Sequence, residues 1–233
     1  MIRRDPNLVM VERIATALGP LRERLVFVGG CAAGLLLTDP AAALARVTYD
    51  VDLLAEVTAL PGYHQLEETF SGLGFKRDLT PDAPICRWRF EEIEVDLMPM
   101  DDAVLGFANR WYPLVAETCR EQVLPSGTVI RLIAAPAFLA TKFEAFSDRG
   151  QGDFLLSHDL EDIINVIDGR PELMDEVAQA PEALRAYIGA RFRELLAQSR
   201  FHDALPGLIF PDESHSERLS LMRQRLKSIA EYR

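Results

Sequence analysis

The chain has 233 residues, and its 36 acidic and 25 basic residues give a formal net charge of −11 at pH 7. Apolar residues make up 48% of the sequence and charged residues 26%, a composition typical of a globular protein with a sizeable core. Disordered and fibrous chains are thereby excluded. The excess of acidic residues also argues against a protein whose whole surface binds nucleic acid, because such surfaces neutralise phosphates with lysine and arginine.

The sequence predicts neither a membrane span nor a secretory leader. Its longest uncharged stretch, residues 25–38, is shorter than the roughly 18 to 20 residues that cross a bilayer. The first six residues include two arginines and lack an apolar region, so a cytoplasmic location without a membrane partner is expected. Three cysteines, Cys31, Cys86 and Cys119, lie far apart without metal-binding spacing and are expected to be reduced.

The first part of the chain is expected to mix helices and strands. Apolar residues with a period near 3.6 predict an amphipathic helix over residues 6–21. Residues 25–28 form a short apolar run that ends at Gly29-Gly30, and a helix is expected over 32–37. This stretch therefore predicts a strand, a glycine turn and a helix.

A second strand follows with an acidic face. In residues 47–55 apolar side chains alternate with Thr48, Asp50 and Asp52, which predicts a strand with both aspartates on one face. Beyond it the patterns predict a helix over 63–73 and strands over 75–79, 85–91, 93–98, 121–124 and 128–133.

From residue 135 onward the pattern is helical nearly throughout. We therefore expect an α+β fold in which an α/β core over residues 1–134 is followed by a helical subdomain over 135–233 that packs on it. The predicted helices of the second part span 135–147, 157–168, 171–179, 181–199 and 214–232.

Three aspartates on predicted strands could form a metal site. Asp50 and Asp52, at i and i+2 on one strand, lie about 7 Å apart, and Asp96 on a later strand could complete the set. Oxygen-ligated Mg²⁺ or Mn²⁺ ions can share such carboxylates, and paired hard cations suit phosphoryl transfer. Gly29-Gly30 at a helix start would let backbone N–H groups approach phosphate oxygens.

Each of these motifs also has a purely structural explanation. Asp50 and Asp52 could be a solvated strand face, Gly29-Gly30 a simple turn, and Asp96 a charge that protects a sheet edge from aggregation. The order of the motifs along apolar strands favours a site, because burying several carboxylates together is costly without a cation.

The same motifs resemble the nucleotidyltransferase superfamily with the DNA polymerase β-like fold. More specifically, the chain resembles the AbiEii/AbiGii branch, whose members include toxins of bacterial toxin–antitoxin and phage-abortive systems. The resemblance implies a mixed sheet flanked by helices, followed by a C-terminal helical subdomain. Its five motifs lie, in order, in residues 27–33, 46–53, 95–97, 142–146 and 158–163.

The resemblance implies a role for each residue of these motifs. Asp50 and Asp52 would hold the metal ions, and Asp96 would complete the set and orient or deprotonate the acceptor hydroxyl. Lys142 would contact the triphosphate or neutralise the leaving pyrophosphate, and Asp159 would take the late aspartate position of the family.

The nucleotide is expected near Gly29, Gly30 and Thr48. The Thr48 hydroxyl could bond a phosphate or simply satisfy a strand edge. Two positions depart from the family, since Cys31 stands where Ser or Thr is usual and His158 where Arg is common. Both departures weaken the inference of toxin activity more than that of the fold.

Three features of the second part have plainer alternatives. Lys142 could be an ordinary solvated helix lysine. Ser157 could cap a helix whose first turn gains from Asp159 and Glu161 beside the positive end of the dipole. The glycine-rich segment 147–153 could cover a nucleotide or only connect two helices.

The predicted function is transfer of a nucleoside monophosphate from an NTP to a hydroxyl of an RNA 3′ end such as that of a tRNA, a protein or a small molecule. A toxin with a cognate antitoxin is one form of it. A metal-dependent nucleotide-sugar glycosyltransferase and a non-catalytic nucleotide-binding or partner-binding module are the alternatives. Residues 182–233 hold nine basic and seven acidic side chains, so an RNA acceptor would be expected to meet these helices.

Overall fold

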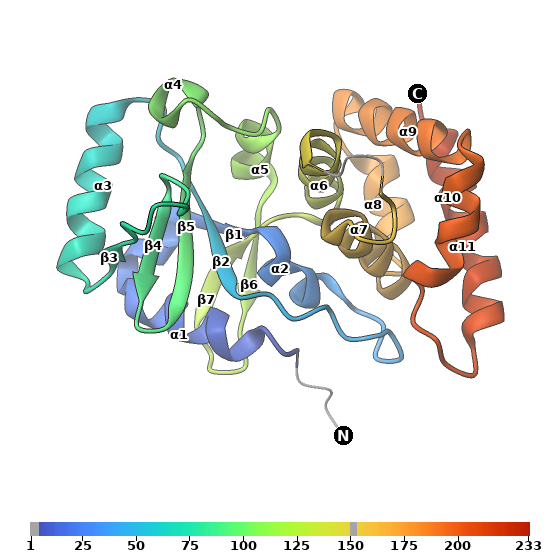
Figure 1. The fold of residues 1–233 in the computed structure, drawn as a ribbon, viewed down its shortest axis with the longest axis horizontal. Helices are drawn as coiled ribbons and strands as arrows, with labels where there is room; N and C mark the ends of the chain where they lie inside the picture. The colour runs from blue at the N-terminus through green and yellow to red at the C-terminus, as the bar shows by residue number, and fades with distance from the viewer. Residues whose placement is uncertain (1–4, 150–152) are drawn as a thin grey trace. The chain divides into compact units, whose positions relative to one another are not determined.

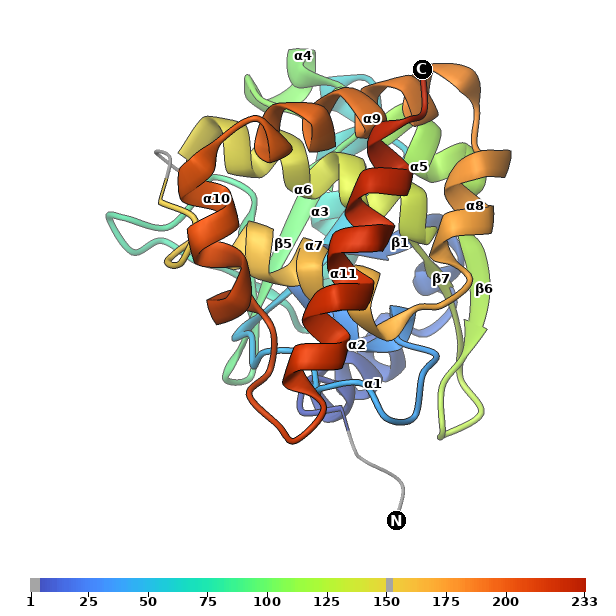
Figure 2. The same cartoon turned by 90° about the vertical axis from the view of Figure 1, so that its right-hand side faces the viewer.

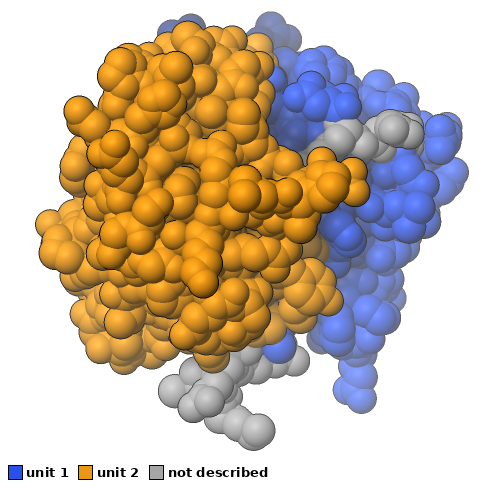
Figure 3. Space-filling model, turned by 60° about the vertical axis from the view of Figure 1, so that its left-hand side comes forward, with its two compact units in different colours: residues 1, 36–45, 135–233 blue, residues 2–35, 46–134 orange. Residues whose placement is uncertain are grey.

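The computed structural model describes residues 5–149 and 153–233 of the chain. These residues form two compact units, which Figure 3 colours separately. The sheet unit contains residues 5–35 and 46–134, and the helical unit contains residues 36–45 together with the described residues from 135 onward. The division of the chain after residue 134 stays a prediction, and residues 36–45 cluster with the helical unit although they precede it in sequence.

The sheet unit is built on a seven-stranded mixed sheet with the order β3-β4-β5-β2-β1-β7-β6 (Figure 1). Strand β1 is antiparallel to β2 and parallel to β7, and the central strand β2 is parallel to β5. All four residues of β1 are buried, as expected of an apolar strand with neighbours on both sides. The strands are β1 (Leu25–Val28), β2 (Asp50–Ala55), β3 (Lys76–Arg77), β4 (Arg87–Phe90), β5 (Ile93–Pro99), β6 (Arg120–Val123) and β7 (Val129–Leu132).

Helices of the sheet unit bury apolar stripes. In α1, four buried residues recur at helical spacing, namely Val11, Ile14, Ala15 and Leu18. The helices are α1 (Leu8–Leu18), α2 (Gly29–Leu36), α3 (Leu60–Gly72), α4 (Asp102–Leu105) and α5 (Tyr112–Thr118), with a 3₁₀ turn at Gly19–Arg24. The mixed sheet with these helices confirms the predicted α+β class.

The helical unit has an aromatic and aliphatic core of its own. Phe143 and Phe192 meet edge to face with ring centroids 4.8 Å apart, which joins α6 to α9. Figure 2 shows α7, α9 and α11 of this unit from the side. The helices are α6 (Ala135–Arg149), α7 (His158–Gly169), α8 (Leu173–Gln179), α9 (Glu182–Leu196), α10 (Ser199–Ala204) and α11 (His215–Ala230), with a 3₁₀ turn at Leu205–Leu208.

Residues 36–45 are tied to the helical unit by hydrogen bonds. The backbone N–H groups of Thr38 and Asp39 both donate to the carbonyl of Gly169, at 2.9 and 3.0 Å. The guanidinium of Arg170 donates to the carbonyl of Leu36 at 2.7 Å. These bonds satisfy carbonyls at the ends of α7 and α2, which have no partner within their helices.

Three predicted elements end or begin elsewhere for local reasons. The first helix stops at Leu18, because Gly19 adopts a positive φ of 53°. Strand β2 starts at Asp50 rather than at residue 47, since the Thr48 N–H donates to a side chain instead of a neighbouring strand. Strand β3 has two residues, because the Asp78 carboxylate accepts bonds from Thr80 and turns the chain.

Other differences concern short helices. The predicted helix over 181–199 is interrupted after Leu196, where Gln198 is extended, and α10 follows. Helices α4 and α5 were not predicted, because α4 depends on the local cap that Asp101 provides and α5 on a proline in its first turn. Within the residues described, no helix has both the length and the apolar character that a membrane span requires.

Candidate active site

Strand pairing brings the three predicted aspartates together. Asp52 lies opposite Asp96 in the parallel β2–β5 pair and opposite Val28 in the antiparallel β1–β2 pair. Ligand oxygens of Asp50, Asp52 and Asp96 all lie within 4.8 Å of one another. Asp96 is buried, and Asp50 and Asp52 are partly exposed, so the cluster opens at the edge where β1 ends.

The glycines lie against this cluster. Both belong to the first turn of α2 rather than to a separate turn before it. Gly29 has a φ of +67°, and a Cβ atom there would lie 1.7 Å from the Asp52 carboxylate oxygen. A Cβ on Gly30 would lie 2.8 Å from the Arg46 guanidinium. The helix therefore begins in contact with the acidic cluster only because the first position has no side chain.

Thr48 supports Asp50. Its hydroxyl donates to Asp50 Oδ1 at 2.6 Å, and its side chain is nearly buried. The backbone N–H of Thr48 donates to Asn7 Oδ1 at 3.0 Å, and Asn7 Nδ2 donates to the carbonyl of Arg46 at 2.9 Å. Asn7 thus holds the segment that leads into β2. The sequence carried no signal for it beyond a polar residue at the start of an amphipathic helix.

Arg87 is a site residue that the sequence interpretation missed. Its guanidinium donates two parallel bonds to Asp96, both at 2.8 Å, and one bond to Glu94 at 2.6 Å. A further contact of 3.4 Å reaches Asp50. The bonds to Asp96 raise the pKa of the Arg87 side chain above its ordinary value. Alternating bases in 87–89 and acids in 94–96 were the available signal, because a hairpin places them opposite each other.

None of the three cysteines belongs to the group of candidate metal ligands found among the described residues. All three lie in the described part of the chain and are thiols rather than disulfides. The Cys31 thiol, at the family's Ser or Thr position, is buried and donates to the carbonyl of Val28 at 3.2 Å. Burial raises the pKa of Cys86 to about 12, so this thiol is neutral at physiological pH.

Lys142 and Asp159 form a second cluster, in the helical unit. The Lys142 ammonium lies 3.1 Å from Asp159 Oδ1 and 2.7 Å from Asp162 Oδ2. The three side chains are 7%, 6% and 1% exposed, so Lys142 is not a solvated helix lysine. Asp162 was not predicted as a site residue, although a helical repeat of three places it beside Asp159.

The start of α7 follows the capping prediction. Ser157 Oγ accepts the backbone N–H of Leu160 at 3.2 Å, and His158 is exposed beside Glu161. Asp159 is buried against Lys142, so its role exceeds that of a charge at a helix end. The expectation for segment 147–153 falls in part on residues 150–152, which lie outside the described residues.

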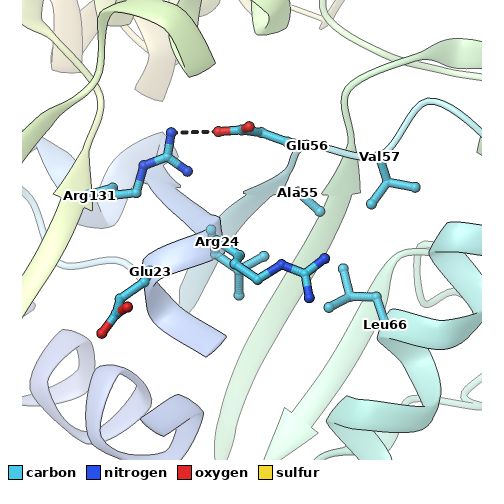
Figure 4. A pocket seen from close by; sticks show the side chains of 8 residues that line it. Glu23, Arg24, Ala55, Glu56, Val57, Leu66 and Arg131 are labelled. Carbon is cyan, nitrogen blue, oxygen red and sulfur yellow. Dashed lines mark hydrogen bonds and ion pairs between the residues drawn. The ribbon is translucent and has the colours of Figure 1, made fainter. Parts of the chain in front are cut away.

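A cavity of about 250 Å³ lies at the other end of the β1–β2 pair (Figure 4). Leu25 and Ala55, which line it, are paired in the strand register, three positions from Val28 and Asp52. Arg131 forms an ion pair with Glu56 at its wall. None of the predicted site residues lines this cavity.

The donor set of the acidic cluster fits a hard divalent cation. Asp50, Asp52 and Asp96 offer only carboxylate oxygens, which Mg²⁺ and Mn²⁺ prefer over nitrogen and sulfur ligands. The three carboxylates lie close enough to repel one another, and a bound cation would offset this repulsion.

Comparisons with known proteins support the fold. No family model matches the chain, and no curated protein matches it. An antigenic nucleotidyltransferase-like protein from Paracoccidioides brasiliensis aligns over 86% of this chain and 93% of its own, with 24% identity and a TM-score of 0.51.

Two further solved structures align less well. The antibiotic-resistance factor ANT(2'')-Ia covers 86% of this chain and 98% of its own, with 16% identity and a TM-score of 0.49. JHP933 from Helicobacter pylori covers 98% and 94%, with 13% identity and a TM-score of 0.46. The comparison of folds therefore rests on the Paracoccidioides protein. The chain has a mixed α+β fold like that of this nucleotidyltransferase-like protein.

Proposed function

We propose that the chain is a metal-dependent nucleotidyltransferase that moves a nucleoside monophosphate from an NTP to a hydroxyl acceptor. The observation that carries this proposal is the convergence of Asp50, Asp52 and Asp96 beside the first turn of α2. In a nucleotidyltransferase-like fold, this arrangement combines ligands for hard cations with backbone N–H groups at a helix start.

Asp50 and Asp52 would hold divalent ions, with Asp96 completing the set. Bound Mg²⁺ or Mn²⁺ would polarise the phosphoryl group and offset the charge of the leaving pyrophosphate. Thr48 holds one oxygen of Asp50, and Arg87 holds both oxygens of Asp96. Asp96 is therefore fixed in orientation, as a carboxylate that accepts the proton of an acceptor hydroxyl must be.

The start of α2 would receive the triphosphate. Gly29 and Gly30 begin this helix at the positive end of its dipole, where the first backbone N–H groups have no partner within the helix. The Arg46 guanidinium lies over Gly30, close to Thr48, and adds a positive charge to the same place. This cation would favour the approach of a phosphate to a place beside three carboxylates.

Lys142 and Asp159 are proposed as the remaining members of the machinery. Asp159 and Asp162 hold the Lys142 ammonium in one position. Contact of this ammonium with a triphosphate oxygen is proposed from the family resemblance, since the side chain is 7% exposed and already paired with two carboxylates.

Part of the positive charge of the C-terminal helices is used within the protein, which weakens the case for an RNA acceptor there. Several of their arginines are engaged within the protein: Arg193 and Arg225 donate to backbone carbonyls, and Arg218 pairs with Asp168 and Asp212. These charges are therefore committed to the fold rather than offered to phosphates. A toxin of the AbiEii/AbiGii type, with an antitoxin as partner, is the more specific form of the proposal.

Asp50→Asn is the test of this function. Calorimetric titration with each NTP in the presence of Mg²⁺ should detect binding to the wild-type protein. Pyrophosphate release with labelled NTPs and a panel of hydroxyl acceptors should fall by orders of magnitude in Asp50→Asn and in Asp52→Asn. If the protein is a toxin, expression should also arrest bacterial growth in the wild type and not in these variants.

Unchanged turnover in both variants would contradict the assignment. NTP binding that is lost in Asp50→Asn, without product from any acceptor, would instead indicate a nucleotide-binding module.

A further inference from the structure

Arg87 contacts two carboxylates of the acidic cluster, Asp96 and Asp50, and the orientation of Asp96 accounts for only the first of these contacts. Its Nε and Nη2 atoms bond the two oxygens of Asp96, each at 2.8 Å, and Nη2 also lies 3.4 Å from Asp50 Oδ2. The Arg87 and Asp96 side chains are 19% and 11% exposed, so water screens these charges far less than it screens a surface ion pair.

The position of Nη2 between two carboxylates matters because both belong to the candidate metal site. A cation shared by Asp50 and Asp96 would draw on the same oxygens that Nη2 contacts. Asp50 has its other oxygen engaged by Thr48. Arg87 therefore supplies a positive charge at the place where a divalent ion would otherwise be most strongly attracted.

Neighbouring charges fix Arg87 in this position. In the β4–β5 pair Arg87 lies opposite Asp96, and Arg89 lies opposite Glu94. One carboxylate oxygen of Glu94 accepts a hydrogen bond from Arg87 at 2.6 Å, and the other accepts one from Arg89 at 2.7 Å. Arg89 is anchored in turn by Asp78 at 2.7 Å. The Arg87 guanidinium is thus held by a network of charge-assisted hydrogen bonds rather than by a single flexible contact.

We propose that Arg87 is a positioning residue that competes with divalent cations for Asp96 and Asp50. It keeps Asp96 oriented toward the reacting hydroxyl and weakens cation binding at the Asp50–Asp96 pair while no nucleotide is bound. This inference rests on the proposed function, because it assigns the three carboxylates to a metal site. The triphosphate, which brings negative charge, then offsets the repulsion between Arg87 and an incoming ion.

The test is a Mn²⁺ titration of the nucleotide-free protein, with free Mn²⁺ measured by electron paramagnetic resonance. Arg87→Met removes the charge and keeps an unbranched side chain, so its Mn²⁺ affinity or stoichiometry should rise, by on the order of tenfold in affinity. Arg89→Met is the matched control. Arg89 lies on the same strand as Arg87, and its guanidinium bonds Asp78 and Glu94 instead of Asp50 and Asp96. Its Mn²⁺ binding should equal that of the wild type.

Thermal unfolding supplies the second readout. Mn²⁺ should raise the melting temperature of Arg87→Met more than that of the wild type or of Arg89→Met, because a ligand that binds only the folded state stabilises it. If Arg87→Met does not fold, Arg87→Lys replaces it. A point charge cannot clamp both oxygens of Asp96, so a smaller rise in affinity, still above the control, is expected.

The outcomes separate this inference from the function on which it rests. Equal Mn²⁺ binding in the wild type and the Arg87 variant overturns the role of Arg87 and leaves the metal site intact. An equal rise in both arginine variants also overturns it, because the effect would then come from Glu94. No Mn²⁺ binding in any of these proteins overturns the metal assignment and this inference together.

Discussion

Gly29 links the backbone of the β1–α2 connection to the carboxylate of Asp52. Its positive φ is strained for any residue with a side chain, and the space that a Cβ atom would need is filled by the Asp52 carboxylate. Two requirements therefore meet at one position. The carboxylate can approach the helix start only while residue 29 is glycine.

Gly29→Ala should both destabilise the protein and disturb the site. We expect the free energy of unfolding to fall by roughly 1–3 kcal/mol or more from backbone strain, measured by urea denaturation. Mn²⁺ affinity should fall as well, because Asp52 must move. Gly72→Ala is the control, since a Cβ there meets nothing within 4 Å and its φ is not positive. Equal stability of the two variants would contradict this account.

At the scale of elements, buried charge joins α6 to α7. Lys142 on α6 faces Asp159 and Asp162 on α7, and all three side chains are nearly inaccessible to water. Removing Lys142 takes its positive charge away from two buried carboxylates, which costs more than the cluster itself contributes.

Lys142→Met should therefore lower the free energy of unfolding by roughly 3–5 kcal/mol, measured by urea denaturation. Lys227→Met, at an exposed position of α11, should change it by less than about 0.5 kcal/mol. If enough Lys142→Met protein folds, its affinity for Mg²⁺–NTP tests the proposed contact with the triphosphate. Unchanged stability would mean that the two aspartates find other partners.

Elements with strong periodicity could be predicted from the sequence, and contacts between elements could not. The strand before Gly29 and the aspartate pair on β2 follow from local patterns alone, and β5 contributes Asp96 as expected. Arg87 was missed because its role depends on the register of the β4–β5 hairpin. For Lys142 on α6 the sequence left both a site role and a solvated position open, because helical spacing alone does not say which face is buried.

At the scale of the whole molecule, the charge of −11 opposes folding through self-repulsion. Part of the excess acid is concentrated at Asp50, Asp52 and Asp96, where Arg87 offsets some of the negative charge. General screening by salt and specific binding at the cluster should therefore both stabilise the protein, by different mechanisms. Monovalent salt provides only the first of these.

Melting temperatures at matched ionic strength separate the two effects. NaCl should raise the melting temperature modestly, because it screens repulsion among exposed carboxylates. MgCl₂ should raise it further in the wild type, since a bound ion stabilises only the folded state, and EDTA should remove this additional rise. In Asp52→Asn the response to NaCl should persist while the additional response to MgCl₂ disappears. Identical responses to both salts in the wild type would show that the cluster does not bind Mg²⁺ without nucleotide.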